Sequence, residues 1–170
     1  FREGQKEVIT SLEEGHDAIA ILPTGNGKSF IYQYIGVKEK CRVVIVSPLI
    51  ALMVDQVASL KQLGIHRAVA ITSLMTEAEK NYILSTLNEY QFIFVSPEML
   101  QAPRFFKELS KLKIGLLVVD EAHCISQWGY DFRSDYLFIG KMRKSLKNPR
   151  TLALTATATT QVVHDIYTFL

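Results

Sequence analysis

Short apolar runs, separated by longer stretches of mixed polarity, are the dominant pattern along this chain. The runs are rich in β-branched residues and are bounded by polar residues or glycine, which is typical of buried β-strands. We therefore expect strands over residues 17–22, 42–47, 68–71, 92–96, 114–119 and 151–154.

The stretches between these runs carry apolar positions at helical spacing. They predict helices over residues 5–14, 28–34, 49–63, 76–88, 102–111, 136–146 and 160–170. Continuously apolar strands that alternate with helices indicate an α/β fold, a parallel sheet with helices on both faces. In such a sheet the carboxyl ends of all strands lie at one edge, where ligands bind.

The composition is that of one globular domain with a sizeable core, since 48% of the 170 residues are hydrophobic. The formal net charge of +2 is too small to indicate a nucleic-acid partner by itself. The most apolar window, residues 43–54, is too short for a membrane span, and the first residues lack a secretory signal. We expect a protein with no membrane partner, in the cytoplasm, or in the nucleus of a eukaryote. Cys41 and Cys124 have no spacing typical of a zinc site or disulfide.

The first expected strand runs into a glycine-containing loop, residues 23–29, with the sequence PTGNGKS. Phosphate groups need free backbone N–H groups, a helix N-terminus and a cation. Gly25 and Gly27 permit the turn, Lys28 is the cation, and the Ser29 hydroxyl is placed to bind Mg²⁺. This segment predicts the phosphate half of a nucleoside triphosphate site.

The expected strand 114–119 ends at the sequence DEAH, residues 120–123. A carboxylate there, Asp120, would hold Mg²⁺, and Glu121 would orient the attacking water. The alternative is an ordinary glycine turn together with an acidic pair that caps the next helix. A strict phosphate-loop pattern would also require glycine at Leu22. The occurrence of both segments directly after apolar runs favours the triphosphate site.

Three aromatic residues, Trp128, Tyr130 and Phe132, alternate with small or polar residues shortly after the acidic pair, and Arg133 follows them. Bases of a single strand stack on such rings for about 1–3 kcal/mol each, whatever their identity. The alternative is that the three rings form one face of a buried strand.

Serine and threonine residues recur at the expected strand ends, each shortly before a helix N-terminus. A row of such groups could hold the phosphates of an extended nucleic-acid strand without reading its sequence. The alternative is plain helix capping, and the two roles are compatible. The positions are Thr24, Ser47, Thr72, Ser73, Ser96 and Thr155.

Together these motifs resemble the first motor domain of RecQ-family DNA helicases, over nearly the whole chain. The resemblance implies a RecA-like P-loop NTPase domain that uses ATP and Mg²⁺. It makes Lys28, Asp120, Glu121 and His123 catalytic, with Ser29 and Asp120 at the metal. The nucleotide-binding residues would be Arg2, Gln5, Thr24, Gly25, Asn26, Gly27, Lys28 and Ser29. The segment 153–159 would link the state of the nucleotide to movement, through Thr155 and Thr157.

The resemblance also implies the partners. The DNA-contacting residues would be Pro48, Leu49, Gln56, Ser73, Ser96, Gln127, Trp128, Tyr130, Phe132 and Arg133. The family couples ATP hydrolysis to 3′ to 5′ translocation on single-stranded DNA and to unwinding at duplex junctions in repair and recombination. A second RecA-like domain of the same polypeptide would supply an arginine finger.

The chain begins with Phe1 rather than methionine, so we expect a single domain truncated at both ends. The second RecA-like, zinc-binding and winged-helix regions of the family would lie outside it. We therefore expect the isolated chain to be weakly active or inactive.

Three positions depart from the family pattern: Tyr130 replaces histidine, Met99 replaces arginine and Asn26 replaces glycine. Two other functions remain open. A DEAH-type RNA helicase shares the hydrolytic pair but not the aromatic segment, and a nucleotide-gated module could clamp DNA without travelling along it.

Overall fold

The structure is a computed structural model that describes residues 4–23, 27–156 and 158–170 of the chain. In this part of the chain, six parallel strands form one sheet in the order β1-β6-β5-β2-β4-β3. The strands are β1 (Ala18–Ile21), β2 (Val43–Val46), β3 (Ala68–Ile71), β4 (Phe92–Val95), β5 (Leu116–Val119) and β6 (Thr151–Thr155). All six strands expected from the apolar runs are confirmed, with ends that differ by no more than a residue or two.

Helices connect the strands. They are α1 (Gln5–Glu13), α2 (Gly27–Glu39), α3 (Ile50–Gln62), α4 (Glu77–Ser85), α5 (Pro97–Leu100), α6 (Pro103–Ser110), α7 (Ile139–Ser145) and α8 (Thr160–Phe169), with the 3-10 helices η1 (Leu87–Glu89), η2 (Ala122–Ile125) and η3 (Ser134–Phe138). The pattern did not predict α5 and η2, because a single turn is too short to show a period. Likewise, the helices expected over residues 76–88 and 136–146 each divide into an α-helix and a 3-10 turn.

Helix α2 is longer than predicted, because it continues through Gly36 to Glu39. A side chain at Gly36 would place its Cβ only 2.6 Å from the ring of Phe92 on β4. Glycine is therefore present for close packing of α2 on the sheet, although by propensity alone it weakens a helix.

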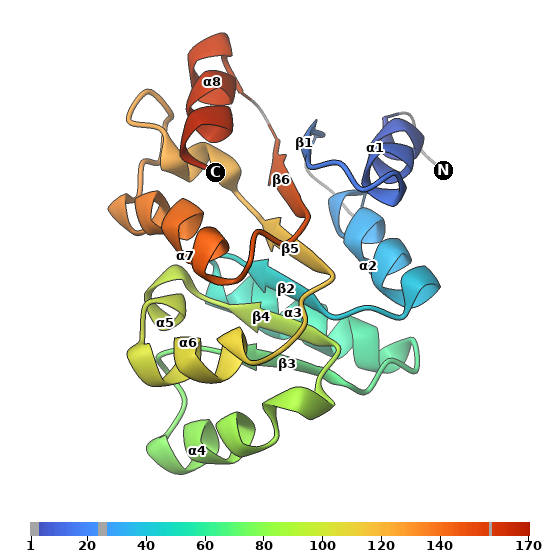
Figure 1. The fold of residues 1–170 in the computed structure, drawn as a ribbon, viewed down its shortest axis with the longest axis vertical. Helices are drawn as coiled ribbons and strands as arrows, with labels where there is room; N and C mark the ends of the chain where they lie inside the picture. The colour runs from blue at the N-terminus through green and yellow to red at the C-terminus, as the bar shows by residue number, and fades with distance from the viewer. Residues whose placement is uncertain (1–3, 24–26, 157) are drawn as a thin grey trace.

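Alternate residues of each central strand enter two separate cores. On β2, Val44 and Val46 pack in one core, and Val43 and Ile45 pack in the other. Helices α1 to α3 cover the second of these cores and helices α4 to α8 cover the first, so the helices lie on opposite sides of the sheet (Figure 1). The expected α/β architecture with two covered faces is confirmed.

Neighbouring strands bring distant chain segments to one edge of this sheet. Strand β6 lies between β1 and β5, with Ile21 beside Thr155 and Val119 beside Ala153. Because the three strands are parallel, the segments that follow β1, β5 and β6 all leave the sheet at the same edge. These are the segments in which the sequence predicted chemistry.

Candidate active site

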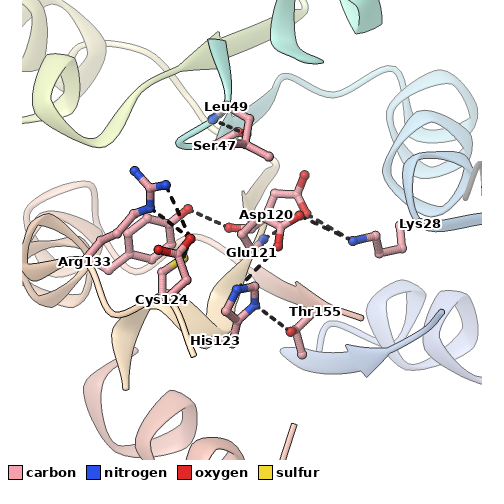
Figure 2. Close-up of polar contacts among 11 residues, drawn as sticks. Lys28, Ser47, Leu49, Asp120, Glu121, His123, Cys124, Arg133 and Thr155 are labelled. Atoms are coloured by element: carbon pink, nitrogen blue, oxygen red, sulfur yellow. Dashed lines mark hydrogen bonds and ion pairs between the residues drawn. The ribbon is translucent and has the colours of Figure 1, made fainter. Parts of the chain in front are cut away.

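Lys28, in the first turn of α2, faces the two acidic residues that follow β5 (Figure 2). Its Nζ lies 3.8 Å from Oδ1 of Asp120 and 3.8 Å from Oε1 of Glu121. The phosphate-loop lysine and the acidic pair thus converge, as predicted. A cation at a helix N-terminus opposite two carboxylates can serve a phosphate and its metal ion together.

A pocket of about 290 Å³ opens beside these groups, between α2 and α3. Its polar lining includes Lys28, Ser29, Asp120 and Glu121, together with Ser47 and Gln56. The Ser29 hydroxyl and the Asp120 carboxylate are oxygen donors of the kind that Mg²⁺ prefers. The donor set at this position therefore fits the magnesium ion that the sequence predicts.

Burial and hydrogen bonds hold Asp120 in place. Desolvation raises the pKa of the Asp120 carboxyl group, and the positive charge of Lys28 opposes that rise. The hydroxyl of Tyr136, a fully buried residue, donates to the backbone oxygen of Asp120 at 2.8 Å. Oδ1 of Asp120 accepts from the backbone N–H of Glu121 at 2.9 Å. The local pattern had placed Tyr136 only in a helix, and its contact with the site was not foreseen.

Glu121 has a left-handed backbone, with φ 51° and ψ 44°, which is uncommon for a residue with a side chain. Its carboxylate reaches two neighbours, with Oε1 toward Lys28 and Oε2 at 3.6 Å from Nε2 of His123. The unusual backbone thereby places the acid between the phosphate-loop lysine and the histidine of the same motif.

His123 is buried and hydrogen-bonded to a different strand end, with its Nδ1 2.9 Å from Oγ1 of Thr155. Desolvation lowers the pKa of the His123 ring, and the Glu121 carboxylate opposes that effect. A neutral ring protonated on Nε2 accepts the Thr155 hydroxyl at Nδ1 and directs its own N–H toward Glu121. The residue predicted for coupling, Thr155, therefore contacts the predicted catalytic histidine (Figure 2).

Gln5 of α1 is buried, and its Nε2 donates to the backbone oxygen of Gly27 at 2.7 Å. This bond joins the residue predicted for base recognition to the end of the phosphate loop. Base recognition itself stays a prediction. The predicted residues Arg2, Thr24, Gly25, Asn26 and Thr157 lie outside the described residues.

The aromatic segment projects from the molecule. Trp128 is 75% exposed, Tyr130 77% and Phe132 36%, and the segment forms turns and no strand. The alternative that these rings form a buried strand face is wrong. Exposed rings beside an exposed glutamine, Gln127, suit base stacking.

The same segment folds back onto the acidic motif. The ring of Tyr130 stacks on the ring of His123, with centroids 4.5 Å apart and planes inclined by 18°. A Cβ at Gly129 would lie 2.9 Å from the backbone oxygen of His123, so only glycine permits this approach. The exposed Tyr130 ring is thus in direct contact with His123, which in turn contacts Glu121.

Arg133 ends the aromatic segment and pairs with Asp131, with Nη2 to Oδ2 at 3.3 Å. Ligand atoms of His123, Cys124 and Asp131 lie within 4.8 Å of one another, a proximity that their spacing in the sequence does not reveal. Desolvation raises the pKa of the Cys124 thiol to about 12, and Arg133 already neutralises Asp131. These features favour a structural cluster over a metal site at this position.

The strand-end serines and threonines differ in their contacts and exposure. The hydroxyl groups of Ser47 and Thr72 accept backbone N–H groups two residues later and so close local turns. The helix that follows Thr72 is capped by Thr76, and α3 has no side-chain cap, so the capping alternative is not confirmed at these two positions. Among the predicted DNA contacts, Leu49 and Ser73 are exposed and Pro48 is partly exposed, whereas Ser96 is buried. A direct contact between the Ser96 hydroxyl and DNA is not supported by this burial.

Gln56 differs from the other predicted DNA contacts, because it lines the pocket beside Lys28 and Glu121. Its Oε1 accepts from Nε2 of Gln33, which joins α3 to α2. Its position lies between this pocket and the outer surface.

In the described part of the chain, no helix is long and apolar enough to cross a membrane.

Known proteins resemble this chain over nearly its whole length. The model of the DEAD/DEAH box helicase family matches residues 2–166. The probable ATP-dependent DNA helicase RecS of Bacillus subtilis is 47% identical over 170 residues, which are 100% of this chain and 34% of RecS. The ATP-dependent DNA helicase RecQ of Haemophilus influenzae is 39% identical over 168 residues, which are 98% of this chain and 27% of that protein. The chain thus spans about a third or less of the length of these relatives.

The solved helicase domain of Hef from Pyrococcus furiosus superimposes with a TM-score of 0.78. It is 22% identical, and the match covers 100% of this chain and 36% of that one. At this identity the likeness shows the fold alone, and it confirms the RecA-like arrangement of sheet and helices.

Proposed function

Because this chain belongs to the DEAD/DEAH box helicase family, we propose that it is the first motor domain of a longer, RecQ-type ATP-dependent DNA helicase. The observation that carries the proposal is the convergence of Lys28, Asp120 and Glu121, with an exposed aromatic segment stacked on the adjacent His123. Strong sequence similarity to RecS and RecQ, which are named as DNA helicases, favours DNA as the polymer.

In the proposed reaction, ATP lies with its phosphates on Gly25, Gly27 and Lys28, and with its base against Arg2 and Gln5. Ser29 and Asp120 would hold Mg²⁺, which supplies charge neutralisation for the phosphate oxygens when bound. Lys28 would then exchange part of its contact with the carboxylates for the terminal phosphates.

Glu121 would orient the water that attacks the terminal phosphoryl group in line. His123 supports this role, because its Nε2 faces Oε2 of Glu121 while its other nitrogen is held by Thr155. An arginine from a second RecA-like domain of the longer protein would neutralise the charge of the transition state.

Single-stranded DNA would bind across the exposed aromatic segment and the surface near Leu49 and Ser73. A base that stacks on Trp128 or displaces Tyr130 changes the stack over His123, and so changes the setting of Glu121. We propose that this contact couples DNA binding to hydrolysis, that the movement is 3′ to 5′, and that the protein serves DNA repair or recombination. Its place in the cell would be the cytoplasm or nucleoid of a bacterium, or the nucleus of a eukaryote.

The test is ATP hydrolysis and strand displacement by the longer protein that contains this chain. We expect single-stranded DNA to raise hydrolysis more than single-stranded RNA, and duplexes with a 3′ overhang to be opened. A preference for RNA would favour a DEAH-type RNA helicase. DNA-stimulated hydrolysis without displacement would favour a nucleotide-gated clamp. Either result would overturn the proposal.

A further inference from the structure

The turn that presents Trp128 is bonded to a helix far along the chain. The Oγ of Ser126, a fully buried residue, donates to Oδ2 of Asp165 on α8 at 2.6 Å. The same Oγ accepts the backbone N–H of Trp128 at 3.1 Å. A continuous path of two hydrogen bonds therefore leads from the carboxylate on α8 to the residue with the exposed indole ring.

Asp165 is suited to be a fixed point for this path. Its side chain is buried, and its other oxygen, Oδ1, accepts from Nε2 of Gln161 at 3.0 Å. A short O–H···O contact to a carboxylate is among the stronger hydrogen bonds of proteins, more so away from water. Both carboxylate oxygens are thus engaged, and the direction of the group is defined.

Helix α8 is itself fixed at both ends. At its start, the Thr159 side chain caps the helix by accepting from the backbone N–H of Val162. At its end, a Cβ on Gly140 of α7 would lie 2.0 Å from the backbone oxygen of Phe169, and Arg143 donates to the backbone oxygen of Leu170. The side of α8 that carries Val162 packs in the same core as η2.

Strand β6 and helix α8 are consequently hydrogen-bonded to the acidic motif and to the aromatic turn, at one point each. Thr155 bonds to His123 at one point, and Asp165 bonds to Ser126 at the other. The 3-10 helix η2 leads from His123 to Ser126, and its residues are all buried. The bond from Ser126 to α8 thus fixes the start of the aromatic turn relative to His123, in addition to the direct stacking of Tyr130 on that ring.

From this geometry we infer that Asp165 is a positioning residue, which through Ser126 holds the Trp128 turn in register with Glu121. The inference rests on the proposed function, because the position of the turn relative to Glu121 matters only if DNA binding on the turn controls hydrolysis. Asp165 is buried, so it would act without contacting nucleotide or DNA. Loss of the Asp165 side chain would leave the proposed catalytic groups in place, but it would loosen the Trp128 turn, through which DNA binding affects them.

The experiment uses the longer protein that contains this chain, with Ser126→Ala, Asp165→Ala and the double variant. We expect each single variant to lower the factor by which single-stranded DNA stimulates hydrolysis by about tenfold, the size expected for loss of a hydrogen bond to a charged group. The double variant should be no worse than either single variant, because one path is broken in each. Asp165→Asn keeps an acceptor oxygen and should restore much of the stimulation.

A second measurement reports the turn without DNA. The fluorescence anisotropy of Trp128, taken as the difference between each protein and its Trp128→Phe counterpart, should fall in Ser126→Ala and Asp165→Ala. His164→Ala, an exposed neighbour on α8, should retain the anisotropy of the parent protein. Thermal unfolding is recorded for every variant. A general loss of structure is recognised when a fall in Trp128 anisotropy is accompanied by a fall in the melting temperature.

The two readouts separate the possible failures. Unchanged Trp128 anisotropy in Ser126→Ala and Asp165→Ala, or additive losses of stimulation in the double variant, would overturn the role of Asp165. Lower anisotropy in a protein whose parent shows no DNA stimulation would support the anchoring and overturn the proposed function instead. If the single alanine variants do not fold, Asp165→Asn decides the question, because full anisotropy with tenfold lower stimulation would contradict the inference.

Discussion

The imidazole of His123 and the hydroxyl of Thr155 are joined at 2.9 Å although the two residues belong to different strand ends. Strands β5 and β6 are neighbours, so the acidic motif after one meets the end of the other. The residue predicted to link nucleotide state to movement therefore contacts the histidine beside Glu121 directly.

Thr155→Val tests this contact, because valine has a similar shape but no hydroxyl. It leaves Nδ1 of buried His123 without this partner, and we expect a loss of about 1–3 kcal/mol in the free energy of unfolding. We also expect hydrolysis in the presence of single-stranded DNA to fall more than ATP affinity. Both quantities follow from denaturant unfolding and steady-state kinetics.

The matched control is Thr151→Val at the opposite end of β6, where the hydroxyl bonds to the backbone oxygen of Pro149. It should destabilise the fold without a specific loss of hydrolysis. If the two variants lose hydrolysis equally, the Thr155 contact has no particular role in the reaction.

Lys28→Ala should lower ATP hydrolysis by at least about 100-fold, because the charge nearest the predicted phosphate position is removed. It also leaves Asp120 and Glu121 without their shared cation, which weakens nucleotide binding further. Steady-state hydrolysis and nucleotide titration measure the two effects. Lys38→Ala, at an exposed lysine near the other end of α2, is the control, and hydrolysis that survives in Lys28→Ala would refute the phosphate assignment.

Glu121→Gln keeps the size of the side chain but removes its ability to accept a proton. We expect ATP affinity to be retained while hydrolysis falls by about 10²–10⁴-fold, the range for loss of a positioned base. Single-turnover kinetics with nucleotide binding measured in parallel checks this. Glu98→Gln, on α5, should behave like the parent protein. A comparable loss of binding and hydrolysis in Glu121→Gln would instead indicate a structural role.

Trp128→Ala should weaken single-stranded DNA binding by about 5–150-fold, which corresponds to about 1–3 kcal/mol of base stacking. Titration of a labelled oligonucleotide measures it at fixed salt. The control is Tyr167→Ala, since Tyr167 is 81% exposed on α8 and has no predicted DNA role. Equal affinities for the two variants would remove Trp128 from the DNA interface.

Asp120→Asn should separate stability from activity. Burial raises the folded-state pKa of Asp120 above its unfolded value, so folding disfavours the ionised form relative to the protonated form. The ionised carboxylate therefore destabilises the fold at neutral pH, and this destabilisation disappears as the pH falls below the unfolded pKa of about 4.

Asparagine mimics the protonated form, and we expect Asp120→Asn to melt at a higher temperature than the parent protein at pH 8. The difference should shrink as the pH is lowered toward 4, and Mg²⁺-dependent hydrolysis should be lost. Melting curves at several pH values without nucleotide provide the measurement. A lower melting temperature at pH 8 would show that the pair with Lys28 outweighs desolvation.

The strands were predictable because each is an uninterrupted apolar run, as in the sequence Val43–Val46 of β2. The convergence of Lys28 with Asp120 was predictable for a similar reason, since parallel connections send both segments to one edge of the sheet. The exposure of Trp128 was indicated by Gly129 and by the polar residues Gln127 and Asp131 nearby.

Other features depend on contacts between distant residues and leave no local pattern. Tyr136 bonds to the backbone of Asp120 across 16 positions, and Asp165 bonds to Ser126 across 39. A tyrosine in a helical stretch, or an aspartate on an amphipathic helix, shows nothing unusual in the sequence alone. The predicted helix 28–34 stopped short of Gly36, and the close approach of Gly36 to the ring of Phe92, 56 positions later, likewise leaves no local pattern.

The close approach of Gly36 to Phe92 determines more than the length of one helix. Lys28 and Gly36 lie about two turns apart on α2, so the depth at which that helix rests on β4 also sets how far the lysine reaches toward the carboxylates. Because Gly36 has no side chain, nothing separates the backbone of α2 from the Phe92 ring at this point. The position of Lys28 relative to the carboxylates thus depends on packing at Gly36, a buried residue that does not itself line the pocket.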